Sequence, residues 1–135
     1  MPPLSQIHHV KLPVSNLLAS REWYQHVLGF QVEIEFTEDG DLRGLAMADR
    51  DRTLRLALRL DPERAAALSG FDPVALAVPT RDDVQVWAEH LDAVGQQYGG
   101  VVTGHLGGAV LVGLHDPDGI EIRLSPTDIR NPTTP

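Results

Sequence analysis

The chain has 135 residues, of which 42% are hydrophobic and 22% charged, a composition typical of a globular fold with a hydrophobic core. Its formal charge of −8 and its pI near 5.0 argue against nucleic-acid binding, because phosphate contacts need a clustered basic surface. The absence of cysteine excludes disulfides, thiolate nucleophiles and cysteine-ligated zinc, and no apolar run approaches the ~18 residues of a membrane span. We therefore expect a small molecule as the partner.

The first half of the chain reads as a strand, a helix and more strands. In IHHVKLPVSN, apolar and polar residues alternate from Val10 to Val14, as in a half-buried strand. Asn16 can cap a helix that Gly29 ends. Period-two alternation then predicts an apolar face made by Val32, Ile34 and Phe36, a hairpin turn at residues 37–41, and a strand over residues 54–60.

A short helical linker separates this half from the next one. In DPERAAALSG, residues 61–70, Asp61 is the candidate N-cap, Pro62 suits the first helical position and Gly70 ends the helix. In the second half, Thr80 and Asp83 form a capping-box pattern for a helix that Gly95 ends. Two further apolar faces are predicted, one from Val110, Val112 and Leu114 and the other from Ile120, Ile122 and Leu124.

The second half repeats the first at an offset of 64 residues. The matched pairs are Val10 with Val74, Leu12 with Leu76, Val14 with Val78, Trp23 with Trp87 and His26 with His90. After the helix, the two halves align only if the offset between them changes by two residues, which matches Gly29 with Gly95. The repeat predicts one domain over residues 1–128, made of units 6–60 and 71–125, with a tail at residues 129–135.

Two tandem βαβββ units that carry HHVKLPVSN, WYQHVLGF and the turn DPDG at residues 116–119 resemble the vicinal oxygen chelate superfamily of glyoxalases, bleomycin-resistance proteins and extradiol dioxygenases. The resemblance implies an α+β fold. In it, each sheet rolls into a half-barrel cup with its helix on the convex face. It also implies a homodimer, and a cup that in many members holds a divalent metal bound by His and Glu.

Carried over residue by residue, the family's metal ligands are mostly missing. The first-strand histidine falls on His9, but the second histidine falls on Pro73 and the last-strand carboxylate on Arg123, two residues after Glu121. The fourth position, near Arg55, offers no Asp or Glu. A dication needs about four to six donors, several of them anionic. We therefore expect no metal and no other cofactor, unless a one-residue strand slip brings Glu121 beside His9.

Strand alternation predicts a cationic cup. If Val10, Leu12 and the apolar positions of the last strands pack under the helices, the residues between them face the cup, and we expect these to bind the ligand: His9, Lys11, Arg55, Arg59, Glu121 and Arg123. Such a surface on an acidic protein favours an anionic ligand. The alternative is that the arginines are solvated or paired with Glu121. For His9, the alternative is a ring hydrogen-bonded to backbone.

The other aromatic and histidine residues have structural explanations. Trp23 and Trp87 read as helix anchors, and His26 and His90 as helix surface. His105 lies in a glycine-rich connection that can close over the cup or stay a mobile loop, and His115 adjoins the DPDG turn.

Two functions of different class remain open. The preferred one is a small-molecule binding protein of the bleomycin-resistance type that lacks the family metal. The other is an enzyme, either a metal-dependent lyase, isomerase or dioxygenase with an atypical site or a metal-free catalyst that uses His9 or Glu121 as acid or base. The N-terminal MPPLSQ lacks the pattern of a secretory signal, and ten arginines against one lysine suggest a bacterial genome, so we expect the bacterial cytoplasm.

Overall fold

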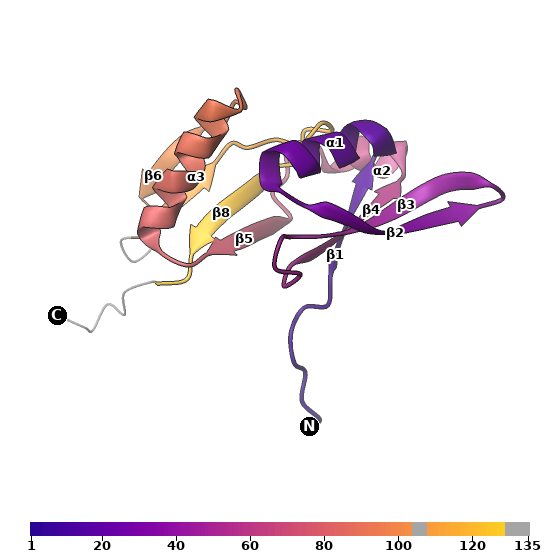
Figure 1. Ribbon diagram of the computed structural model, residues 1–135, viewed down its shortest axis with the longest axis horizontal. Helices are drawn as coiled ribbons and strands as arrows, with labels where there is room; N and C mark the ends of the chain where they lie inside the picture. The colour runs from indigo at the N-terminus through magenta and orange to yellow at the C-terminus, as the bar shows by residue number, and fades with distance from the viewer. Residues whose placement is uncertain (104–107, 129–135) are drawn as a thin grey trace. The chain divides into compact units, whose positions relative to one another are not determined.

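The computed structural model describes residues 1–103 and 108–128. It divides into two compact units, which we call unit 1, Met1–Ala67, and unit 2, Leu68–Pro135. Both contain a four-stranded mixed sheet, and neither sheet closes into a barrel (Figure 1). The predicted α+β fold with a repeated βαβββ order is confirmed. That residues 1–128 form a single domain followed by a tail stays a prediction.

Unit 1 is a sheet with one helix packed on it. Its strand order is β1-β4-β3-β2, and β1 runs parallel to β4 while the other pairs are antiparallel. Figure 1 shows α1 lying along one face of this sheet. The elements are β1 Val10–Val14, α1 Leu17–Leu28, β2 Gln31–Glu38, β3 Asp41–Ala48, β4 Arg55–Leu60 and the short α2 Pro62–Leu68.

Unit 2 repeats the arrangement with the strand order β5-β8-β7-β6, in which β5 and β8 are parallel. Helix α3 contacts all four strands of its sheet. The elements are β5 Val74–Val78, α3 Arg81–Ala93, β6 Gly100–Thr103, β7 Ala109–Val112 and β8 Ile122–Pro126. Of the helices described, none is both long and apolar enough to cross a membrane.

Local signals set the ends of the helices, as predicted. The Asn16 side chain accepts a hydrogen bond from the Ala19 amide, and Gly29 ends α1 with a φ of 76°. Thr80 and Asp83 form both halves of a capping box at the start of α3. These contacts fix where each helix begins on its sheet.

The core of each unit lies between the helix and one face of the sheet. The strand residues that form the core are at most 8% exposed. They include Leu12, Leu45, Met47, Leu56 and Leu58 in unit 1 and Leu76, Leu111, Ile122 and Leu124 in unit 2. The strand residues between them face the other way, as the alternation predicts. We call that second surface the open face. It carries Lys11, Ala57 and Arg59 in unit 1 and Ala75, Glu121 and Arg123 in unit 2.

Two apolar strand faces differ from the prediction. In β2 the register shifts between Val32 and Ile34, so Ile34 and Phe36 leave the core side and are 52% and 47% exposed. A β-bulge of this kind moves the residues that follow it to the other face until the next register shift, here between Phe36 and Thr37, and a period-two pattern does not predict this. In β7 the core residue is Leu111, whereas Val110 and Val112 are half-buried. The expected faces of these two strands were therefore wrong.

Candidate functional site

The open face of unit 1 contains a cavity of about 260 Å³. Its walls combine the apolar side chains of Phe36 and Ala57 with a few polar and charged ones. The residues that line it are His9, Lys11, Phe36, Glu38, Gly44, Leu45, Ala57, Leu58 and Arg59, of which Leu45 and Leu58 have buried side chains on the core side of the sheet. Ligand pockets generally measure about 300 to 1,000 Å³ and have this mixed character. We call this cavity the first cavity. Its volume lies just below that range, so it can hold only a small ligand or a part of a larger one.

The first cavity exists because two positions on its floor are small. Gly44 pairs with Phe36 on one side and with Arg59 on the other, so it lies between their side chains. A Cβ atom at Gly44 would lie 3.1 Å from the Leu58 carbonyl oxygen and 3.7 Å from the Phe36 ring. Ala57 in the neighbouring strand leaves the rest of the space.

A salt bridge holds one wall of the first cavity in place. Arg59 Nη1 donates to Glu38 Oε1 at 2.8 Å, and Nη2 donates to Oε2 at 3.2 Å. The hydrogen bond to Arg59 lowers the pKa of Glu38 and raises that of Arg59. Both groups stay charged at neutral pH, and the forked geometry fixes the guanidinium.

Lys11 is an exposed residue on the same wall. Among the residues that the structure describes, none forms an ion pair with its ammonium group. The first cavity thus has two cations, Lys11 and Arg59, and one carboxylate, Glu38. Its lining is locally positive in a protein whose formal charge is −8.

His9 lines the first cavity next to Lys11. Its Nδ1 lies 2.9 Å from Nδ1 of His8, so one ring donates to the other according to their tautomers. The two rings are edge to face, with centroids 5.2 Å apart. The ring therefore has a side-chain partner, and its place in the lining agrees with the cup-facing interpretation.

The predicted site residue Arg55 does not line the first cavity. It donates through Nε to Glu33 Oε1 at 3.2 Å, and Arg52 adds a longer ion pair to the same carboxylate at 3.8 Å. Arg55 therefore belongs to a charge cluster at the start of β4.

Glu121 and Arg123 lie together on the open face of unit 2. Arg123 Nε donates to Glu121 Oε2 at 2.7 Å, and Arg123 Nη1 lies 3.3 Å from Asp72 Oδ2. The Gly113 amide also donates to Glu121 Oε2, at 3.1 Å. The bond from Arg123 is the main cause that lowers the pKa of Glu121, whose side chain is 12% exposed. The arginine is thus already bound to two carboxylates.

The residues at the family's metal positions do not fit a divalent ion. Pro73 has no donor atom in its side chain, and Arg123 puts a fixed positive charge, held by Glu121 and Asp72, where a ligand is needed. Over residues 1–103 and 108–128, no three His, Asp or Glu side chains gather in a way that could hold a metal. That the protein uses no metal stays a prediction.

Among the described residues, none of the other histidines and neither tryptophan lines the first cavity. Trp23 and Trp87 are half-buried on their helices, and the Trp87 ring meets His90 edge to face at 5.2 Å. His26 is exposed. His115 forms an isolated antiparallel bridge with Glu121, and His105 lies outside the described residues.

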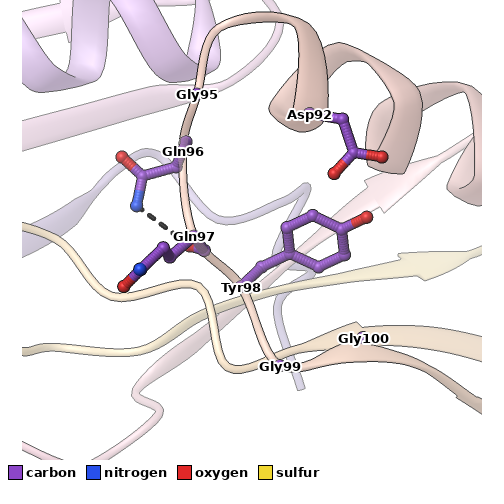
Figure 2. Close-up of a pocket in the computed structure, with 7 residues that line it drawn as sticks. All are labelled: Asp92, Gly95, Gln96, Gln97, Tyr98, Gly99 and Gly100. Atoms are coloured by element: carbon purple, nitrogen blue, oxygen red, sulfur yellow. Dashed lines mark hydrogen bonds between the residues drawn. The ribbon is translucent and has the colours of Figure 1, made fainter.

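Sequence reasoning missed a shallow hollow of about 690 Å³ after α3, which contains none of the predicted site residues (Figure 2). Partial burial and a hydrogen bond with Asp92 raise the pKa of Tyr98, and Gln96 Nε2 donates to the Gln97 carbonyl at 3.0 Å. The glycines here are structural, since a Cβ at Gly113 would meet the Gly99 amide nitrogen at 2.5 Å. Only the tyrosine within GQQYGG could have signalled a surface site.

The family model of the Glyoxalase/Bleomycin resistance protein/Dioxygenase superfamily matches residues 6–124. The chain belongs to this superfamily. No curated protein sequence matches it.

Solved structures share the fold at low sequence identity. The antibiotic binding protein TnmS3 from Streptomyces sp. CB03234 is 22% identical, with a TM-score of 0.71 over 93% of this chain and 98% of that one. The lactoylglutathione lyase from Agrobacterium tumefaciens is 16% identical, with a TM-score of 0.73 over 93% and 96%. The fosfomycin resistance protein FosX from Listeria monocytogenes is 14% identical, with a TM-score of 0.69 over 94% and 97%. The superfamily fold is thus found in binding proteins and in enzymes.

Proposed function

We propose that this protein binds a small acidic molecule in the first cavity and holds it without chemical change. The observation that carries the proposal is the cavity's lining: the apolar ring of Phe36 and the small floor residues Gly44 and Ala57 lie beside the positive group of Lys11. An apolar wall supplies affinity and a few polar groups supply orientation, which is what binding without catalysis needs.

The charges favour an acid over a neutral ligand. Arg59 is compensated by Glu38, but Lys11 has no ion-pair partner in the part of the chain that the structure describes. A ligand carboxylate or phosphate can bind Lys11 directly and accept from the outer N–H groups of Arg59. The likeness in fold to TnmS3, an antibiotic binding protein, supports binding as the activity.

The lining of the first cavity offers little for acid–base catalysis. Its one carboxylate, Glu38, is held by both ends of the Arg59 guanidinium, and its one imidazole, His9, contacts His8 through Nδ1. A general base must reach the substrate proton with a free lone pair, so Nε2 of His9 is the one candidate base in this lining. The partner of its Nδ1 is a second imidazole and not the carboxylate that orients the ring in a catalytic triad, which favours a binding protein over the metal-free enzyme.

Blocking the cavity tests the proposal. Thermal-shift screening of acidic and neutral metabolites, followed by calorimetry, should find acids that stabilise the protein. Ala57→Leu, which fills the floor of the first cavity, should abolish their binding. Ala75→Leu on the open face of unit 2 is the matched control and should bind as the wild type does. Equal binding by both variants would place the ligand elsewhere and overturn the proposal.

A homodimer in a bacterial cytoplasm also remains our proposal. The apolar residue Ile34 on the edge strand β2 is 52% exposed and does not line the first cavity, and such a residue is of the kind that a second copy covers. Light scattering on the purified protein should give twice the mass of the chain, and the mass of one chain would contradict the proposal.

A further inference from the structure

A second cavity, of about 530 Å³, adjoins the first cavity in unit 1. Both cavities are lined by Lys11 and Arg59, so these two side chains form the boundary that the cavities share. The second cavity continues along the ends of β1 and β4 to the first turn of α2. Its other lining residues are Pro13, Leu60, Asp61 and Arg64.

The two cavities differ in chemical character. The Phe36 ring and the methyl group of Ala57 give the first cavity its apolar surface. The second cavity is lined by three cations, Lys11, Arg59 and Arg64, and by one carboxylate. One end of the combined groove thus suits an apolar body and the other an acidic group.

The carboxylate in the second cavity is held by α2. Asp61 Oδ1 accepts from the Arg64 amide at 3.1 Å, and Asp61 Oδ2 accepts from Arg64 Nη1 at 2.7 Å. The ion pair lowers the pKa of Asp61 and raises that of Arg64. The Arg64 side chain is nevertheless 82% exposed, so a ligand can reach its guanidinium from solvent.

We propose, on the basis of the binding function above, that the ligand is an elongated acid with one negative charge that spans both cavities. Its apolar body lies against Phe36 in the first cavity, and its carboxylate lies between Lys11 and Arg64 in the second. Two of the three cations are compensated, Arg59 by Glu38 and Arg64 by Asp61, which leaves the charge of Lys11 for the ligand. A carboxylate bound there forms charge-assisted hydrogen bonds, the strong class.

The proposal assigns a binding role to Arg64, which the sequence analysis did not single out, and to Asp61, which it predicted only as an N-cap. Arg64 binds the acidic head directly. Asp61 competes with that head for the same guanidinium and so limits its affinity. Removing the charge of Asp61 while keeping the helix cap should therefore tighten the binding of an acid.

Isothermal titration calorimetry with two probes of equal length tests this arrangement. The probes are 4-phenylbutyrate and its neutral counterpart 4-phenylbutan-1-ol. We expect the acid to bind the wild type about tenfold more tightly, as one added hydrogen bond to a charged group implies. Lys11→Met and Arg64→Gln should each remove that advantage and leave the affinity for the alcohol unchanged.

Three further variants separate charge from folding. Arg64→Lys keeps the charge and should restore most of the acid's advantage. Asp61→Asn keeps the side-chain oxygen that caps α2 but removes the charge that competes for Arg64. The affinity for the acid should therefore rise about threefold, which is less than a full charge-assisted hydrogen bond contributes. Arg50→Gln is the control, because this side chain is 92% exposed and lines neither cavity. It should leave the affinities for both probes unchanged.

The outcomes distinguish this inference from the proposed function. If Arg64→Gln keeps the acid's advantage as Arg50→Gln does, the second cavity does not hold the acidic head and the inference is overturned, whereas the proposed function stands as long as Ala57→Leu abolishes binding. If both probes bind the wild type with equal affinity, the inference and the acid preference of the proposed function are both overturned. If neither probe binds the wild type at millimolar concentration, both proposals fail.

Discussion

Units 1 and 2 have the same core but different open faces. The strand registers make them comparable, because Val10 pairs with Leu56 in unit 1 as Val74 pairs with Ile122 in unit 2. Buried positions carry like residues: Leu12 and Leu76, Val14 and Val78, Leu56 and Ile122, Leu58 and Leu124. Every open-face position differs: His9 and Pro73, Lys11 and Ala75, Arg55 and Glu121, Ala57 and Arg123, Arg59 and Ser125.

One of these differences bears on the first cavity directly. Ala57 leaves space on the open face of unit 1, and at the equivalent position of unit 2 the side chain of Arg123 extends to Glu121 and Asp72. The same backbone thus carries a cavity in one unit and a charge network in the other. The helix side of each sheet determines the fold, whereas the open face is free to acquire a function.

The largest expected effect concerns the shared core. Leu58→Ala and Leu124→Ala remove equivalent side chains that are each 1% exposed, and each should lower the free energy of unfolding by about 2 to 5 kcal/mol. Urea denaturation followed by circular dichroism measures it. Leu18→Ala, at a residue that is 57% exposed on α1, is the control and should cost far less. A small loss for one core variant alone would break the equivalence of the two units.

The elements and their ends could be predicted because their signals are local. Asn16, Gly29, Thr80 and Asp83 act within one or two turns of their own helix, and the sequence shows them directly. The 64-residue offset then gave the second unit from the first. The alternation of β4 and β8 also predicted which residues leave the core.

The charges of the open face could not be predicted to the same depth. Arg59 meets Glu38 across β3, and Arg123 meets Asp72 from the segment before β5, so the partners lie 21 and 51 positions apart in the chain. Such pairs depend on strand order and on the β2 bulge, which alternation does not report. Arg55, Arg59 and Arg123 are each paired with a carboxylate, which is the alternative that the sequence analysis left open for the arginines, and Lys11 has no ion pair among the described residues.

A second prediction addresses the charge network of unit 2. Glu121 has a lowered pKa in the folded state, so it stabilises the protein above the ordinary glutamate pKa, and this stabilisation is lost as pH falls through the lowered value. Glu121→Gln should cost about 1.5 to 3 kcal/mol at pH 7, the range for hydrogen bonds to a charged group. When urea denaturation is measured from pH 7 down to pH 3, the free energy of unfolding should fall less steeply with pH for the variant than for the wild type. An equal pH dependence would mean that the network contributes no stability.

A third prediction uses a difference inside the cores. Ser20 in α1 is fully buried, and its hydroxyl has no hydrogen-bond partner in the described part of the chain, whereas the equivalent residue of α3 is Val84. Because an unsatisfied buried hydroxyl is destabilising, Ser20→Ala should raise the free energy of unfolding by about 1 kcal/mol. The reverse change, Val84→Ser, should lower it. A loss of stability in Ser20→Ala would show that the hydroxyl has a partner, such as an internal water.

The smallest expected effect concerns the salt bridge of unit 1. Arg59 and Glu38 have the same forked geometry that strengthens buried pairs, but their side chains are 40% and 55% exposed, and water screens pairs of that kind. Glu38→Gln should therefore leave the urea midpoint almost unchanged, in contrast to Glu121→Gln in unit 2, whose carboxylate is 12% exposed. If the two variants lost equal stability, burial would not be what separates the two networks. The Glu38→Gln protein should instead differ in ligand binding, because freeing Arg59 adds a second uncompensated cation to the first cavity and should tighten the binding of an acid.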